Sequence, residues 1–113
     1  MSGRTTGLAA WPSTADDADR LFAALGSASR REALAELGRR DDPAEVADLA
    51  ASLAESTDRP DDADEVAVRL WHIDLPKLAD LGLVTVDYGT RVAELTPDGR
   101  HAAAVTARHE NGQ

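Results

Sequence analysis

Four basic side chains in the second half of the chain are of the types that contact nucleic acids: Arg69, His72, Lys77 and Arg91. Arg69, His72 and Pro76 follow i, i+3, i+7 spacing, so on a helix they would share one solvent face. An arginine on such a face can pair bidentately with guanine, and a lysine or histidine can meet a phosphate. Arg91 follows Gly89 and Thr90 in an expected turn. The pattern predicts a contact with double-stranded DNA.

The acidic residues around this helix disfavour DNA binding. Six acidic residues lie between Asp61 and Gly82, against Arg69 and Lys77, which makes a net charge of −4. Phosphate neutralisation supplies much of the affinity for DNA, so a reading helix is usually positive. At 1 M salt, however, the Debye length is about 3 Å, and neither repulsion nor attraction reaches far. We therefore place DNA binding ahead of the alternative, a module that docks a protein partner through this helix.

The rest of the sequence offers little for other kinds of chemistry. The chain has no cysteine, which excludes thiolate metal sites and cysteine nucleophiles. His72, His101 and His109 are not clustered in the sequence, so we expect no metal site and no cofactor. Nothing resembles a nucleophile elbow or a pair of catalytic carboxylates, and we do not expect an enzyme. Trp71 could stack on a base or a partner, but its neighbours favour a partly buried position in the core.

Length and composition indicate a single small domain that is adapted to high salt concentrations. The 113 residues carry a net charge of −9, from 21 acidic and 12 basic residues, and Lys77 is the single lysine. This bias resembles that of salt-accumulating halophilic archaea, although a GC-rich genome also favours Ala, Arg and Asp. The apolar run Leu8 to Trp11 is too short for a signal peptide, and no stretch approaches transmembrane length. We expect a cytoplasmic protein without a membrane association.

The first half of the chain predicts three helices after a loose tail, residues 1–12. Ser13 or Thr14 can cap the first helix, and Gly26 is expected to end it in the C′ position. The second runs from Ser27 to Gly38. The third opens with a capping-box pattern, followed by apolar residues at i, i+3, i+4 and i+7. The residues of that pattern are Asp42, Pro43 and Glu45, and the apolar ones are Val46, Leu49, Ala50 and Leu53.

The second half predicts a polar loop, a fourth helix, a hairpin and a last helix. The loop spans residues 56–62, and the fourth helix starts at Asp62 and continues through Pro76 to Leu81. Its apolar face is expected to carry Val66, Leu70 and Ile73. Pro76 lacks an N–H, so it marks a kink or the start of a new turn. From Val84 to Leu95 the period changes to that of a β-hairpin, and a last helix follows from Pro97 to about Arg108, before a tail of residues 109–113.

Three segments resemble ArsR-like winged helix-turn-helix proteins: residues 21–37, LFAALGSASRREALAEL; residues 75–84, LPKLADLGLV; and residues 95–100, LTPDGR. The stretch VAVRLWHIDLPKLADLGLVTVDYG looks most like an uncharacterised haloarchaeal winged-helix family, through Leu70-Trp71-His72 and Leu75-Pro76-Lys77-Leu78. The resemblance covers about residues 14–105. Asp74 departs from it, because that family usually has His before Leu-Pro-Lys-Leu, and the loop at 56–62 is longer than in an ordinary helix-turn-helix.

The resemblance implies a mainly α fold with a small β-hairpin wing, a winged helix-turn-helix domain over residues 13–108. It implies a DNA-binding regulator of transcription, with Arg91 where winged helices often place a phosphate or minor-groove contact. It also implies a homodimer that pairs through the first and last helices. The run Ala102 to Ala104 would let two backbones approach closely there.

Overall fold

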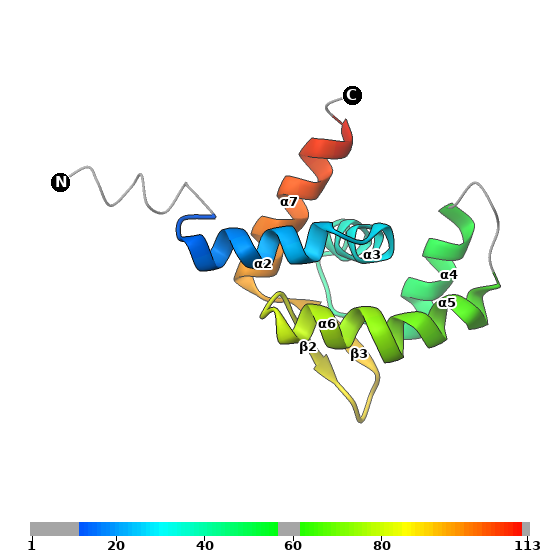
Figure 1. Cartoon of the computed structure of the whole chain (residues 1–113). Coiled ribbons are helices and arrows are strands. Elements are labelled where there is room, and N and C mark those ends of the chain that lie inside the picture. The colour runs from blue at the N-terminus through cyan, green and yellow to red at the C-terminus, as the bar shows by residue number, and fades with distance from the viewer. Residues whose placement is uncertain (1–11, 57–61, 112–113) are drawn as a thin grey trace.

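The computed structural model describes residues 12–56 and 62–111. In this part the chain is mainly helical, with one small three-stranded antiparallel sheet in the order β1-β3-β2 (Figure 1). The elements are α2 (Ala15–Leu25), α3 (Ala28–Gly38), β1 (Ala44–Glu45), α4 (Val46–Ser56), α5 (Ala63–Arg69), a π turn (Leu70–Asp74), α6 (Leu75–Asp80), β2 (Val84–Asp87), β3 (Val92–Leu95) and α7 (Pro97–Asn111). The expected N-terminal tail and most of the expected polar loop lie outside the described residues.

The first two helices begin where the sequence predicts, with side-chain caps that satisfy free backbone donors. The hydroxyl of Thr14 accepts from the N–H of Asp17, and the hydroxyl of Ser27 accepts from the N–H of Arg30. Gly26 ends α2 but has φ −72°, so the expected left-handed C′ role is wrong. Arginines of α3 meet the last carbonyls of α2 instead, since Arg30 donates to the carbonyl of Ala23.

The predicted start of the third helix is wrong. Pro43 and Glu45 precede the helix, and Ala44–Glu45 form the edge strand β1, which pairs with Ala93 and Val92 of β3. The N–H of Val46 also donates to the carbonyl of Arg91, at 3.0 Å. These bonds satisfy the free edge of β3, which the capping box could not do. From Val46 onward the prediction is confirmed, because its four apolar residues are all buried.

The predicted hairpin is confirmed, with Val84 opposite Leu95 and Asp87 opposite Val92. Asp87 organises the turn, because its Oδ1 accepts from the N–H groups of Gly89 and Thr90. The turn closes with the N–H of Arg91 bonded to the carbonyl of Asp87, at 2.8 Å. The left-handed residue of this turn is Arg91, at φ 57°, an uncommon conformation for a residue with a Cβ.

The fourth helix is continuous from Ala63 to Asp80, but it contains a π turn. The N–H of Leu75 donates to the carbonyl of Leu70, five residues back, instead of four. The extra residue turns Ile73 outward, to 59% exposure, and turns Asp74 inward, to 1%. The expected apolar face is therefore wrong at Ile73. Pro76 lies in the first turn of α6, where its missing N–H is tolerated.

The helix ends at Asp80, one residue before the expected Leu81, and Gly82 follows in a left-handed conformation with φ 78°. The N–H of Leu83 bonds to the carbonyl of Leu78, and that of Gly82 to the carbonyl of Ala79, which is the Schellman arrangement. Gly99, in the first turn of α7, lies very close to the backbone of Leu83. A Cβ there would lie 1.8 Å from the carbonyl oxygen of Leu83, so only glycine fits.

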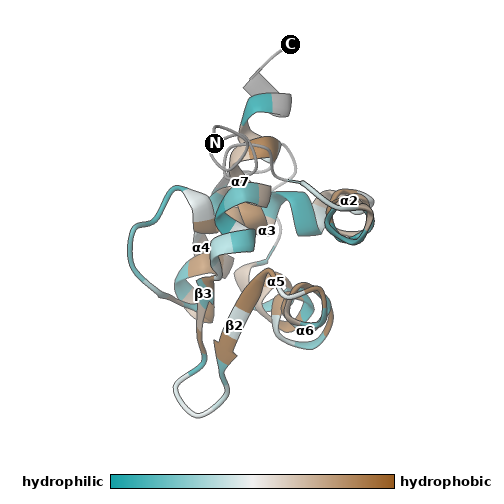
Figure 2. Cartoon of the chain, turned by 90° about the vertical axis from the view of Figure 1, so that its left-hand side faces the viewer, coloured by the Kyte–Doolittle hydropathy of each residue, from teal (hydrophilic) through white to brown (hydrophobic). Residues whose placement is uncertain are grey.

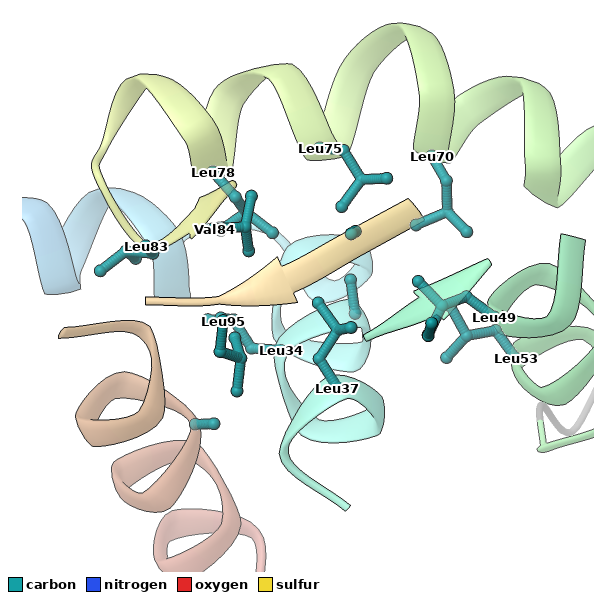
Figure 3. Close-up of a cluster of buried hydrophobic side chains, with 14 of the residues drawn as sticks. Leu34, Leu37, Leu49, Leu53, Leu70, Leu75, Leu78, Leu83, Val84 and Leu95 are labelled. Carbon is teal, nitrogen blue, oxygen red and sulfur yellow. The ribbon is translucent and has the colours of Figure 1, made fainter. Parts of the chain in front are cut away.

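The core lies between α3, the sheet and the fourth helix (Figure 3). Leu70, Leu75 and Leu78 point from the fourth helix toward Leu34 and Leu37 of α3 and toward the sheet, with Leu49 and Leu53 of α4 beside them. In Figure 2, β2 alternates between hydrophobic and less hydrophobic positions along its length, as a half-buried strand should.

The last helix, α7, continues to Asn111, three residues beyond the expected Arg108. Its residues Ala102 and Ala103 are buried inside the chain, where α7 packs on α3. They are therefore not free to join a second subunit, and only Ala104 of the expected run is exposed. No helix in the described part of the chain is long and apolar enough to cross a membrane.

Candidate nucleic-acid interface

The structure places three of the four candidate residues along the outer side of one helix and the fourth on the hairpin. His72 in the π turn and Lys77 in α6 are exposed, and the side chain of Arg69 at the end of α5 is 38% exposed. Arg91 is exposed at the β2–β3 turn. Figure 1 shows this hairpin projecting beyond the fourth helix, away from the C-terminal end of α7.

Arg69 is joined to Asp74 across the π turn. Its Nε lies 3.6 Å from Oδ2 of Asp74, and the side chain of Asp74 is only 2% exposed. The other carboxylate oxygen, Oδ1, accepts a hydrogen bond from the hydroxyl of Ser29 in α3, at 3.0 Å. Oδ2 of Asp74 and Nε of Arg69 are both buried, and neither has a hydrogen-bond partner in the described residues. The ion pair balances the buried negative charge, and the hydrogen bond from Ser29 connects the fourth helix to α3.

The burial of Asp74 changes the charge of the outer surface of this helix. Between Val66 and Ala79, Asp74 is the only acidic residue, and it faces the interior. The remaining acidic residues sit at the two ends of the helix, with Asp64 and Glu65 in the first turn of α5 and Asp80 in the last turn of α6. The sequence count of six acidic residues therefore overstates the negative charge in the middle of the outer face, where Arg69, His72 and Lys77 lie.

Trp71 connects the fourth helix to the hairpin. The guanidinium carbon of Arg91 lies 4.9 Å from the centre of the Trp71 ring, within the range of a cation–π contact. The ring of Tyr88 meets Trp71 edge-on, with centroids 5.2 Å apart. Trp71 is partly buried against the core, as the sequence predicts. These contacts hold the left-handed Arg91 beside the helix.

A groove of about 350 Å³ lies between the fourth helix, the start of α4 and the hairpin turn. Polar residues of its lining are Glu45, His72, Thr90 and Arg91, and Val68 and Trp71 contribute apolar surface. The groove thus brings together His72 and Arg91, which are far apart in sequence. Arg69 and Lys77 are not part of its lining.

Two neighbouring residues were missed by the sequence reasoning, namely Val68 and Tyr88. Both are well exposed, at 58% and 62%. The alternation of Val84, Val86 and Tyr88 was a signal for the direction of Tyr88, although Tyr88 itself lies in the turn that follows β2. Val68 had no comparable signal, since its exposure depends on which side of the helix the core covers.

No group of three or more potential metal ligands occurs in residues 12–56 and 62–111. His72 and His101 lie on different helices, and the side chain of His109 is outside the described part of the structure.

Comparison with known proteins gives one result. No curated protein and no solved structure matches the chain. Residues 22–94 match a family described as a domain of unknown function, DUF7344. The matched region extends from α2 into β3, and so includes the fourth helix and the hairpin. Because it covers more than half of the 113 residues, the chain belongs to the DUF7344 family.

Proposed function

We propose that this protein is a DNA-binding transcriptional regulator of the ArsR-like winged helix-turn-helix type. In this proposal α4 and the fourth helix form the helix-turn-helix, the fourth helix enters the major groove, and the β2–β3 hairpin is the wing. One observation carries the proposal. The middle of the outer face, between Val66 and Ala79, bears Arg69, His72 and Lys77, while its single acid is buried.

Each candidate residue has a role that its surroundings suit. The ion pair with Asp74 engages the Nε of Arg69, and this leaves the terminal nitrogens of the guanidinium for a base edge such as guanine. His72 and Lys77 are exposed and can meet phosphates on either side of the groove. Arg91 is exposed on the proposed wing, and its role in this proposal is a phosphate or minor-groove contact.

The net charge of −9 is compatible with this role if the protein works in concentrated salt. At 1 M ionic strength charges separated by more than about 3 Å are largely screened, so the acids at the helix ends repel DNA weakly. The same screening weakens the non-specific attraction that most DNA-binding proteins use. Binding should therefore depend on close contacts in the groove.

The test is a binding assay with double-stranded DNA in a series of KCl concentrations. A binding site is first selected from genome-wide crosslinking of the tagged protein in its own cells and from a random-sequence library. Arg69→Ala should weaken binding to that site by about 1–3 kcal/mol and relax its sequence preference, whereas Arg91→Ala should weaken binding to all sequences alike. The matched control is Arg100→Ala, an exposed arginine of α7 away from the helix and the wing.

The second candidate function is docking of a protein partner through the fourth helix. The exposed apolar side chains of Val68, Ile73 and Tyr88 favour it, because such residues are common at interfaces. In that case Trp71→Ala should abolish the complex in a pull-down, and Lys77→Ala, which changes an exposed cation of the same helix, should have little effect. Wild-type protein that binds no DNA at any salt concentration where it is folded would reject the DNA proposal in favour of docking.

A further inference from the structure

The π turn exchanges the positions that an apolar and a charged residue would normally take. Ile73 is 59% exposed and the adjacent Asp74 is buried, the reverse of the usual preference for these residue types. The i to i−5 hydrogen bond between Leu70 and Leu75 produces this exchange. Single π turns within helices are frequent at functional sites. The exposed isoleucine is therefore a feature of this helix that requires an explanation.

A second apolar side chain lies on the same outer surface. Val68 is 58% exposed, and it precedes the exposed His72 by four residues, while Ile73 precedes the exposed Lys77 by four. Residues four apart are neighbours on a helix surface. Val68 and Ile73 therefore alternate with His72 and Lys77 along the face that we propose to enter the major groove.

In that groove the principal apolar group that DNA presents is the C5-methyl of thymine. A methyl contact is also less sensitive to ionic strength than a charge contact, whose range shrinks to about 3 Å at 1 M salt. For a protein with 21 acidic and 12 basic residues, a contact of this kind can supply affinity that charge cannot. The thymine methyl thus matches the apolar side chains of this face, and contact with it would persist at the high salt concentration that the composition indicates.

We propose that Val68 and Ile73 recognise thymine through its methyl group, so that the target sites contain thymines at fixed positions under the middle of the fourth helix. This inference rests on the proposed DNA-binding function. It identifies thymine as the preferred base and assigns this preference to Val68 and Ile73, which were not among the DNA-contacting residues predicted from the sequence.

The test replaces single thymines of the selected site by deoxyuridine, which pairs in the same way and lacks only the methyl. Dissociation constants are measured in molar KCl for each substituted duplex. At one or two positions the wild type should lose affinity by about fourfold, as expected from about 0.8 kcal/mol per buried methyl-sized group. Ile73→Ala or Val68→Ala should bind the thymine and uracil duplexes equally at the corresponding position.

The control variant is Glu55→Ala, which removes an exposed side chain near the end of α4, outside both the proposed face and the surface expected to bind a second subunit. It should keep the full difference between thymine and uracil. Since Val68 and Ile73 are both exposed, their alanine variants should fold, and a thermal melt verifies this. If wild-type protein binds its site but is indifferent to uracil at every position, the thymine inference is wrong and the DNA-binding function stands.

If no DNA binding is found, both the inference and the proposed function are rejected. In that case, loss of a co-purified protein on Ile73→Ala would assign the apolar face to a protein partner.

Discussion

Arg69 and Asp74 lie on either side of the π turn, and their side chains meet beside Ser29 of α3. Asp74 is too deeply buried to repel DNA directly. Its effect on a ligand would act through Arg69, whose guanidinium it restrains, and through the position of the whole helix on α3. Asp74 is for this reason a positioning residue in the proposed interface.

The first prediction concerns this ion pair. Asp74→Asn should lower the free energy of unfolding by about 1–3 kcal/mol, because it removes the charge that balances Arg69 in a buried setting. Thermal or guanidinium unfolding in molar KCl measures the loss. Asp80→Asn is the control, since Asp80 is an exposed acid of the same helix. An equal effect of the two substitutions would contradict the assigned role of Asp74.

The second prediction concerns Asp17, whose carboxylate bonds to Arg20 at 2.6 Å. The Arg20 side chain, followed by the backbone N–H of Ser13, lowers the pKa of Asp17 from 3.8 to about 2. A lowered pKa means that the folded state favours the charged form, so this stabilisation is present above pH 3.8 and is lost as the pH falls to about 2.

Asp17→Asn should therefore flatten the fall in the melting temperature between pH 3.8 and about 2. Asp19→Asn should leave that fall unchanged, because Asp19 is exposed and forms no ion pair within the described part of the chain. Melting curves for the three proteins across this pH range provide the comparison. Parallel curves for the wild type and Asp17→Asn would be the contrary result.

Among the elements, the fourth helix has two faces with different roles. Its inner face, with Leu70, Leu75 and Leu78, packs onto the core (Figure 3), and its outer face carries the candidate contacts. The π turn between α5 and α6 reconciles the two, because it keeps these leucines buried on both sides of Ile73 and Asp74. It also places Pro76 where no N–H is required.

The third prediction compares two residues of α6. Leu78 is fully buried, so Leu78→Ala should destabilise the protein by about 2–5 kcal/mol. Pro76→Ala should change the stability by less than about 1 kcal/mol, because the π turn already accommodates the proline. Unfolding of both variants in the same salt gives the difference. A loss above about 2 kcal/mol for Pro76→Ala would show that the proline itself maintains the π turn.

The molecule as a whole carries an excess of carboxylates, with 21 acidic residues against 12 basic ones. One cluster connects three regions: Arg20 of α2 pairs with Asp17 and with Asp98 of α7, and donates to the carbonyl of Leu81 after α6. Hydrogen bonds to these two acids, Asp98 first, raise the pKa of Arg20. Most other acids are exposed and repel one another.

The fourth prediction follows from this repulsion. The midpoint of thermal unfolding should rise with KCl concentration, because the salt screens the net charge of −9. Circular dichroism across a KCl series measures it. A midpoint that is independent of salt would remove the main support for the halophilic interpretation.

The fifth prediction is that the protein forms a homodimer. Ala102 and Ala103 cannot form the interface, because they pack inside the chain. Phe22 on α2, at 70% exposure, and the free side of α7 around Ala104 are surfaces that a second subunit could bury. The molar mass from light scattering in molar KCl should be twice that of the 12.0 kDa chain, and Phe22→Asp should lower it. A monomer up to high micromolar concentration would contradict the dimer.

Local sequence patterns were sufficient to predict the order of the helices and of the hairpin strands, most helix starts and most of the core. Thr14 and Ser27 cap their helices through hydrogen bonds to residues three positions away, and Gly82 ends the fourth helix through its own φ. The buried leucines follow the helical period. Such features depend on neighbours a few residues apart, so a local pattern is enough to predict them.

The edge strand β1, the π turn and the conformation of Arg91 depend on contacts between distant parts of the chain. β1 exists because β3 offers an unpaired edge, nearly fifty residues away in the sequence, and this edge competes with the capping box at Asp42. In the π turn, Asp74 faces inward to the hydroxyl of Ser29, which the helical period does not encode. Long-range hydrogen bonds outweighed local preferences at these places, and there the sequence pattern failed.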